Sequence, residues 1–306
     1  MTVHLGVKSD AIENRYSFEW LFDIMADFRV SRLQLGSSFS TFAAEDDYFR
    51  RLRGRAEKRG IRISSLFTSH RELGGFASGD PALETATRWG WQRLIHVAAL
   101  VGAESAGSNA GILLRDQPQL MQAGLECFFK HMTDLMGFAR QKGLRAITIE
   151  PMSTTWEYPS TDKQIREMTS FFDRAHAEKP DETVPVLLCG DISHGVADEQ
   201  ERVLFDNWDM FELEIPWMWE FHFKNTDGIF NSTFGFGPKD RARGTIDIRK
   251  LRSLLDANAT WFPTKSLVGY LELPGPKLGR DYTDRLLRGE LEESLTALRE
   301  EFTDQP

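Results

Sequence analysis

Short apolar segments alternate with longer stretches of helical pattern along the chain. Each apolar segment follows a glycine or a polar turn and is rich in β-forming residues, which predicts a strand. Eight such segments begin 29 to 48 residues apart: 3–7, 32–35, 62–67, 103–107, 145–150, 186–190, 219–223 and 267–271. This spacing is typical of strands that are each followed by one helix.

The stretches between these segments carry apolar residues at helical spacing. They predict helices over 18–28, 47–58, 81–101, 117–141, 162–177, 208–216, 247–257 and 283–301. Gly60, Gly102 and Gly143 stand where a left-handed glycine ends a helix before the next strand. Eight βα units of one sense favour a closed parallel barrel, so we expect an α/β protein with a single (β/α)8 TIM barrel domain over 1–306.

The alternative architecture is a doubly wound open sheet. That fold usually has a glycine-rich phosphate-binding turn after its first strand, and here the turn reads KSDAIENRYS. The barrel is therefore favoured.

Composition and charge narrow the class of partner. The 37 Lys and Arg against 46 Asp and Glu give a net charge of −9, which disfavours nucleic acid. No apolar run approaches the ~18 residues of a membrane span, and no secretory leader is recognisable at the N-terminus. With only Cys127 and Cys189 present, we expect a cytoplasmic protein that binds neither nucleic acid nor membrane.

Four consecutive strands of the second half present a potential metal ligand near their carboxyl ends, where TIM barrels place their active sites. These residues are Glu150, Asp191, His222 and Glu272. Any one of them alone is more often a cap, an ion-pair partner or a hydrogen-bonded core residue. Four on successive strands predict a divalent cation site, and three oxygen ligands with one imidazole favour Mn²⁺, with Mg²⁺ or Co²⁺ also suitable.

Further polar residues lie at or just after strand ends and could bind substrate. They are His70, Asn109, His194, Lys224 and Arg243, with Lys8 and Trp156 as further pocket candidates. For each alone, a solvated loop position is the commoner explanation, except that we favour a substrate role for His194 in the D-x-x-H pattern.

Six cations follow the seventh and eighth predicted strands, where barrels often bind phosphate. They are Lys224, Lys239, Arg241, Arg243, Lys277 and Arg280. They are compatible with a phosphorylated sugar. The alternative is that they form ion pairs with nearby aspartates and make only a solvated rim; these aspartates are Asp227, Asp240, Asp247 and Asp281.

The motifs ITIEP, GDISHG, EFHFKN and YLEL resemble the sugar isomerase/epimerase family with a xylose-isomerase-like TIM barrel, over nearly the whole chain. That family includes ketose 3-epimerases and tetrulose-phosphate isomerases or racemases. The resemblance implies that Glu150, Asp191, His222 and Glu272 bind one metal ion and that Glu150 and Glu272 act as acid and base. It also implies that His194 contacts substrate and that the protein is a homo-oligomer, a dimer or a tetramer.

One position departs from the family pattern. The ketose 3-epimerases carry an Arg six residues after the metal-binding His, and this chain has Gly228 there. Substrate contacts in that loop are therefore expected to differ.

These observations predict an enzyme, a divalent-metal-dependent isomerase or epimerase that acts on a small ketose or ketose phosphate through an enediolate. A metal-dependent lyase or dehydratase, including a C-glycosidic bond cleaver, is the second enzymatic possibility. A sugar-binding protein without turnover is the non-enzymatic one. A DNA-repair endonuclease on the same scaffold would need more histidines than the seven present, and the charge of −9 opposes it.

Overall fold

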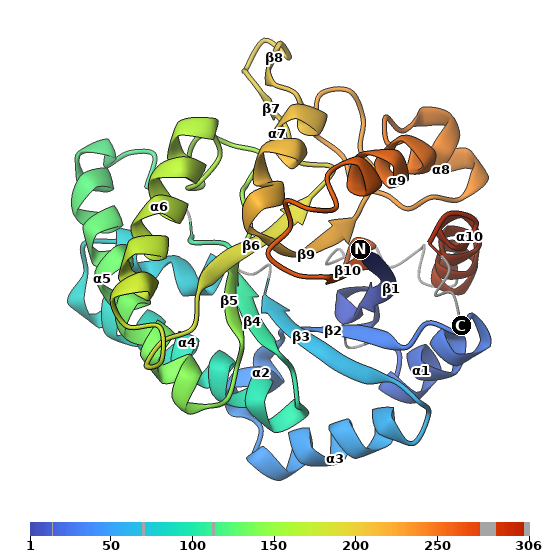
Figure 1. Ribbon diagram of the computed structural model, residues 1–306, viewed down its shortest axis with the longest axis horizontal. Helices are drawn as coiled ribbons and strands as arrows, with labels where there is room; N and C mark the ends of the chain where they lie inside the picture. Colours follow the sequence, from blue (N-terminus) through green and yellow to red (C-terminus); the bar gives the residue numbers. More distant parts are fainter. Residues whose placement is uncertain (14, 69–70, 112–113, 276–285, 303–306) are drawn as a thin grey trace.

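The strands of the computed structural model close into a parallel barrel (Figure 1). The structure describes residues 1–13, 15–68, 71–111, 114–275 and 286–302. Hydrogen-bonded neighbours follow the order β1-β10-β9-β6-β5-β4-β3-β2 around the barrel. The strands are β1 (Thr2–Lys8), β2 (Arg32–Gly36), β3 (Arg62–Thr68), β4 (Ser105–Ser108), β5 (Ala146–Ile149), β6 (Val186–Asp191), β9 (Met218–Phe223) and β10 (Ser266–Leu271). All eight predicted strands are confirmed, and so is the TIM barrel fold.

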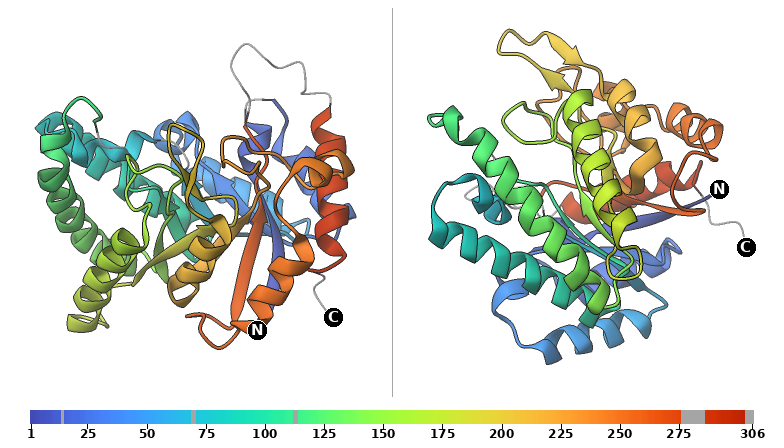
Figure 2. Two further views of the ribbon diagram at one scale, coloured as in Figure 1. Left: turned by 90° about the horizontal axis from the view of Figure 1, so that it is seen from above. Right: turned by 60° about the vertical axis from the view of Figure 1, so that its left-hand side comes forward.

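Helices surround the barrel (Figures 1 and 2). The longer ones are α1 (Phe18–Asp27), α3 (Asp46–Glu57), α4 (Pro81–Val101), α5 (Met121–Gln141), α6 (Asp162–Glu178), α7 (Asn207–Glu214), α9 (Ile248–Ala257) and α10 (Leu287–Arg299). The short ones are α2 (Phe39–Ala43), α8 (Pro238–Arg243), η1 (Ser9–Ile12), η2 (Arg71–Ala77), η3 (Pro118–Leu120) and η4 (Ile215–Trp217). Each predicted helix has a counterpart, although the first residues of the last prediction, 283–285, lie outside the described residues. None of the described helices is long and apolar enough to cross a membrane.

Several small elements were not predicted, among them two short helices and a two-stranded hairpin. Helices α2 and α8 have only five and six residues, too few to show a helical period. Strands β7 (Val196–Ala197) and β8 (Val203–Phe205) form an antiparallel hairpin after β6, and Figure 1 shows it projecting from the barrel. Its apolar residues Val203 and Leu204 are exposed, so no core pattern marks it.

Local signals explain where several helices begin and end. Asp80 precedes α4 and accepts the backbone N–H of Ala82 at 2.8 Å, an N-cap followed by proline at the first helical position. Gly60, Gly102 and Gly143 have φ of 70°, 78° and 84°, as predicted for left-handed helix ends. These glycines turn the chain from a helix back into the next strand.

The barrel interior carries a polar layer below its carboxyl-terminal mouth. Glu220 is 2% exposed, and its carboxylate accepts hydrogen bonds from Ser65, Thr148 and Ser105. Side chains two residues apart on a strand share a face, so His222 lies on the interior face of β9, one layer nearer the mouth. A satisfied polar layer thus supports the site above it.

Asp46 connects α3 to α4. Its carboxylate accepts hydrogen bonds from Arg93 Nη1 and His96 Nε2, both at 2.8 Å. These bonds lower the pKa of Asp46 from 3.8 to about 2.

Replacing Asp46 with Asn should therefore destabilise the protein at neutral pH and progressively less in acid. A depressed pKa in the folded state contributes stability that is present above the unfolded pKa of 3.8 and is lost as pH falls through about 2. Thermal unfolding of both proteins between pH 6 and pH 2.5 should show the difference in Tm shrinking below pH 4. A difference that stays constant would contradict the ionic role of Asp46.

Candidate metal centre and active site

Four ionisable side chains meet at the carboxyl-terminal mouth of the barrel. Glu150, Asp191, His222 and Glu272 each offer a ligand atom, and these atoms all lie within 4.8 Å of one another. Asp191 and His222 lie on β6 and β9, and Glu150 and Glu272 directly follow β5 and β10. These four strands are consecutive in the barrel. Relative exposures are 3% for Glu150, 1% for Asp191, 0% for His222 and 9% for Glu272. The four side chains that the sequence predicts to converge are therefore together in the structure.

His222 lies at the centre of these four side chains, which together form the candidate metal site and are called the metal cluster. Its Nδ1 lies 2.9 Å from Glu150 Oε1, 2.9 Å from Glu272 Oε2 and 3.9 Å from Asp191 Oδ2. Its Nε2 lies 2.8 Å from Gln34 Oε1, an oxygen that can only accept. Burial would lower the pKa of His222, but Cys189, Glu272 and Glu150 outweigh it and raise that pKa well above its usual value, so the ring is protonated on both nitrogens here. With a metal ion in place of the Nδ1 proton, Nε2–H would keep its bond to Gln34 and hold the ring in the orientation for binding.

The donor set fits a divalent cation. Three buried carboxylates around one imidazole lone pair repel one another unless positive charge is shared among them. Three oxygens and one nitrogen suit Mn²⁺, Mg²⁺ or Co²⁺, and the set lacks the thiolates typical of structural zinc.

Asp191 is held by its own loop. Its Oδ1 accepts hydrogen bonds from the backbone N–H of Ser193 at 2.8 Å and from Ser193 Oγ at 2.7 Å. Its Oδ2 lies 2.9 Å from Lys224 Nζ and 3.4 Å from His194 Nε2. Burial favours the neutral acid, but the charges of His194 and Lys224 outweigh it and lower the pKa of Asp191.

A buried lysine completes the charge pattern. Lys8 Nζ lies 3.2 Å from Asp10 Oδ2 and 3.2 Å from Glu272 Oε1. Lys8 is 1% exposed. The expectation that it is more commonly a solvated loop residue is therefore wrong for this position. Burial alone would lower its pKa, but Asp10 and Glu272 raise the pKa above its usual value, which keeps the ammonium charged.

Nearby positive charges lower the pKa values of the two glutamates. Burial would raise the pKa of Glu272, yet Lys224 and Lys8 hold it well below its usual value. Burial likewise opposes ionisation of Glu150, and His222 outweighs it to lower the pKa of Glu150. Both glutamates are therefore ionised at neutral pH.

Two predicted substrate residues line the same mouth. His194 Nδ1 donates to the carbonyl oxygen of Pro151 at 2.7 Å, which fixes the ring beside Asp191. Asn109 follows β4 and is 2% exposed, and its Oδ1 is buried with no hydrogen-bond partner among the residues that the structure describes. Both side chains are ordered by burial before any substrate is present.

The remaining predicted substrate residues differ in position. Lys224 joins the cluster, with its Nζ 3.6 Å from Glu272 Oε2. Arg243 ends α8, is largely exposed, and pairs with Asp240 at 2.7 Å. This is the ion pair that the sequence offered as the alternative to phosphate binding. His70, Lys277 and Arg280 lie outside the described residues.

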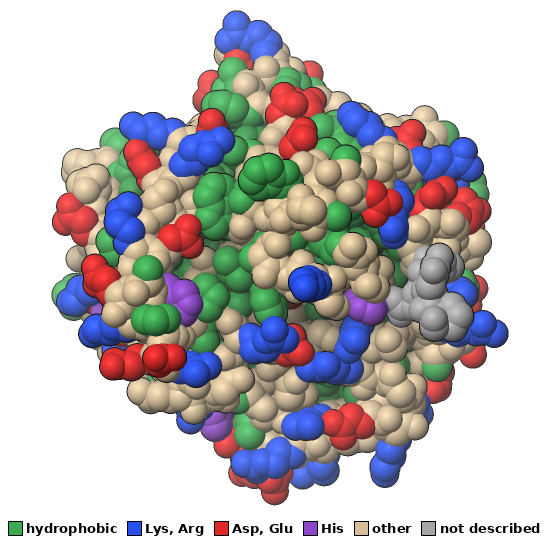
Figure 3. All heavy atoms as spheres, viewed as in Figure 1, with side chains coloured by type: hydrophobic (Ala, Val, Ile, Leu, Met, Phe, Trp, Pro, Cys, Tyr) green, Lys and Arg blue, Asp and Glu red, His purple; other side chains and the backbone are tan. Residues whose placement is uncertain are grey.

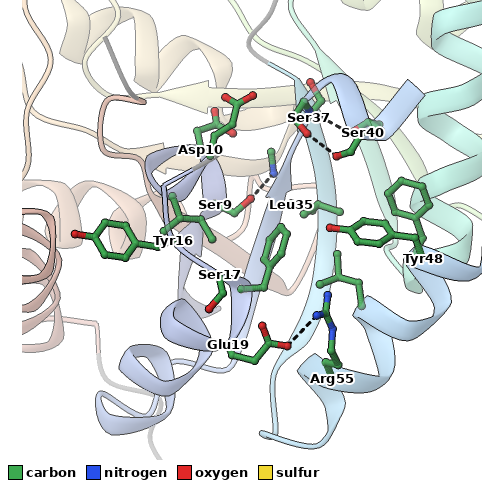
Figure 4. A pocket seen from close by; sticks show the side chains of 18 residues that line it. Ser9, Asp10, Tyr16, Ser17, Glu19, Leu35, Ser37, Ser40, Tyr48 and Arg55 are labelled. Atoms are coloured by element: carbon green, nitrogen blue, oxygen red, sulfur yellow. Dashed lines mark hydrogen bonds and ion pairs between the residues drawn. The ribbon is translucent and has the colours of Figure 1, made fainter. Parts of the chain in front are cut away.

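A pocket of about 320 Å³ lies next to Asp10. Figure 4 shows hydroxyl-bearing side chains around it, including Ser9, Tyr16 and Tyr48. At the end away from Asp10, Glu19 and Arg55 form an ion pair of 2.9 Å. The pocket thus leads from a neighbour of Lys8 outward between α1 and α3.

Sequence reasoning missed Gln34 as a functional candidate. Gln34 lies on β2 and is fully buried, three strands from His222 around the barrel. The available signal was one polar residue inside the apolar segment RLQLG. Only the closed barrel shows that its partner is His222.

A second group of potential ligands links α4 to α5. Glu84, Cys127 and His131 bring ligand atoms within 4.8 Å of one another. Arg88 donates to His131 Nδ1 at 2.8 Å, and His131 Nε2 lies 2.5 Å from Glu84 Oε1. Both ring nitrogens are used and a guanidinium stands beside them, so this group works as a hydrogen-bonded connection between helices.

Comparison with known proteins agrees with the barrel. No protein-family model and no curated protein sequence matches the chain. A candidate xylose isomerase from Rhodospirillum rubrum superposes with a TM-score of 0.80 at 19% identity, covering 99% of this chain and 100% of that one. The chain has the xylose isomerase-like fold.

Other solved structures share this fold. A D-psicose 3-epimerase from Clostridium cellulolyticum H10 gives a TM-score of 0.69 at 13% identity, covering 98% of this chain and 100% of that one. A candidate 3-DHS dehydratase from Bacillus anthracis gives 0.62 at 11% identity, covering 94% and 97%. At these identities the likeness establishes the fold, and the chemistry has to be argued from the site.

Replacing Gln34 with Leu should weaken Mn²⁺ binding by about 10- to 100-fold, because the residue that orients a metal-binding histidine typically contributes that much. Isothermal titration of metal-free protein would measure it. Gln141, exposed at the end of α5, supplies the control variant Gln141→Leu, which should bind as the parent does. Unchanged affinity in a folded Gln34→Leu protein would show that Gln34 does not orient His222.

Proposed function

We propose that this protein is a divalent-metal-dependent isomerase or epimerase of a small ketose or ketose phosphate, acting through an enediolate. One observation carries the proposal. Glu150 and Glu272 each place a carboxylate oxygen 2.9 Å from the same nitrogen of His222. Two ionised carboxylates beside one cation site are the parts that proton transfer next to a carbonyl requires.

Glu150, Asp191, His222 and Glu272 would hold the metal ion, with Mn²⁺ the first candidate. When bound, the cation supplies positive charge that stabilises negative charge developing on substrate oxygens. The cluster already contains three carboxylates against the ammonium groups of Lys8 and Lys224. Asp10 also pairs with Lys8, so four carboxylates exceed the two ammonium groups by two charges. A divalent cation would offset that excess, which favours an anionic intermediate.

Glu272 and Glu150 would move the proton. A carboxylate is a weak base toward a carbon acid, so it must be ionised and held in place. Lys8 meets both needs for Glu272, since its ammonium lies 3.2 Å from Oε1 and favours the ionised form. For Glu150 the protonated His222 does the same before metal binding, with its Nδ1 2.9 Å from Oε1, and a bound cation would take over that role.

The two glutamates allow two outcomes. If one removes the proton from carbon and the other returns a proton to the opposite face, the centre is inverted, which is epimerisation. If a single glutamate moves the proton between neighbouring carbons, an aldose and a ketose interconvert. The ketose 3-epimerases that share this fold favour the first outcome.

His194, Asn109 and Lys224 would orient the substrate. The unpartnered Oδ1 of Asn109 can accept a hydrogen bond from a sugar hydroxyl, and leaving it unsatisfied costs free energy. Lys224 is the cation that a phosphorylated ketose would meet, whereas Arg243 is already paired with Asp240.

Glu150→Gln and Glu272→Gln should each lower turnover by about 10²- to 10⁴-fold, the usual contribution of an acid or base. The assay is incubation in D₂O with C3 to C6 ketoses and their phosphates, with and without EDTA, read by NMR. Deuterium at C3 indicates epimerisation and at C1 aldose–ketose isomerisation, and EDTA should abolish either.

Glu214 provides the matched control. It is a buried carboxyl at the end of α7, outside the metal cluster, and burial raises its pKa well above the usual value, so it is neutral. Glu214→Gln replaces a neutral acid by a neutral amide and should retain activity. Full activity in folded, metal-loaded Glu150→Gln and Glu272→Gln proteins would refute the proposal.

A metal-dependent lyase or dehydratase is the second candidate, because an enediolate can expel a β-substituent instead of being reprotonated. A candidate dehydratase has the same fold, which supports this second function. Mass spectrometry of the product separates the two, since loss of water or of a fragment identifies the lyase. A ligand that binds tightly without exchange or mass change would indicate a sugar-binding protein.

A further inference from the structure

The opposite end of the barrel carries a second polar pocket. A cavity of about 400 Å³ lies among the amino-terminal ends of the strands. Arg32 and Arg62 begin β2 and β3, while Arg145 and Lys265 directly precede β5 and β10. Figure 3 looks onto this end of the barrel, and Lys and Arg side chains gather around its centre.

Two of these guanidinium groups share one carboxylate. Arg62 and Arg145 both pair with the carboxylate of Glu104, with Arg145 Nη1 3.1 Å from Oε2. Arg145 also stacks on Trp219, with its Cζ 5.2 Å from the ring centroid. Each guanidinium has five N–H donors, so sharing one carboxylate leaves most of them available.

The other two cations lack an acidic partner. Arg32 and Lys265 form no ion pair with any residue that the structure describes, and Arg32 Nε is buried without a hydrogen-bond partner. Two acidic residues line the pocket. Glu104 lies at its rim, and Glu220 lies in its floor, where it accepts hydrogen bonds from Ser65 and Thr148. Even with both acids ionised, four cations exceed them by two, in a chain whose net charge is −9.

We propose that this pocket binds a small phosphate-bearing anion as a second site, separate from the metal cluster. Arginine forks match the oxygens of a phosphate, and several cations within one Debye length of ~8 Å reinforce one another. The concave form favours a small molecule over a flat acidic protein surface. Glu220 in the floor of the pocket is two residues before His222 on β9, so the pocket lies beneath the metal cluster, at the other end of the barrel interior.

Pyrophosphate is the probe, titrated calorimetrically into metal-free protein so that chelation does not interfere. One saturable site that weakens steeply with added salt is expected. Arg32→Gln/Lys265→Gln should weaken binding at least tenfold. Glu104→Gln should tighten it several-fold, since it releases both paired guanidiniums, provided that circular dichroism shows the fold retained.

The matched control removes the same charge elsewhere. Arg50 and Arg202 are exposed and pair with Asp47 and Asp198, so Arg50→Gln/Arg202→Gln should bind within twofold of the parent. The absence of saturable binding, or equal weakening in both double variants, would overturn the proposal. So would binding that Lys224→Met abolishes and Arg32→Gln/Lys265→Gln leaves intact, because the anion would then occupy the catalytic end. None of these results depends on the enzymatic activity proposed above.

Discussion

Three carboxylates and one imidazole are buried together at the barrel mouth, and this convergence constrains the rest of the structure. Charged groups removed from water cost several kcal/mol each unless they are paired. Two lysines supply the positive charge: Lys8 on β1 pairs with Glu272, and Lys224 after β9 pairs with Asp191. The four ligand atoms of the carboxylates and the imidazole remain within 4.8 Å of one another, close enough to share a cation.

Closure of the barrel makes this convergence possible. Glu150, Asp191, His222 and Glu272 lie up to about 120 residues apart in the chain, and parallel neighbours bring all four to one rim. Gln34 approaches His222 from three strands away around the barrel. The histidine is therefore held through Nε2 by Gln34 and through Nδ1 by the carboxylates of the metal cluster. The polar layer around Glu220 fills the interior below, where an apolar core would leave these groups no hydrogen-bonding support.

The sequence was sufficient for what periodicity and strand order determine. Eight strands with their helices, the left-handed glycines and the convergence of four strand-end ligands follow from local pattern plus the rule that parallel strands share a carboxyl end. The burial of Lys8 and the pairing of Gln34 with His222 depend on side-chain contacts across the closed barrel, which no local pattern encodes. The β7–β8 hairpin and helices α2 and α8 were missed because short exposed elements bury too little to leave a periodic signal.

The distribution of charge separates the two ends of the barrel. At the carboxyl-terminal mouth the lysines form ion pairs: Lys224 pairs with Asp191, and Lys8 pairs with Asp10 and Glu272. At the amino-terminal end two cations, Arg32 and Lys265, have no acidic partner among the described residues. The lysines at the mouth hold their acidic partners in the ionised form, whereas Arg32 and Lys265 have no described acid to pair with. The two ends of the barrel therefore differ in electrostatic character, with paired charges at the mouth and an excess of positive charge at the amino-terminal end.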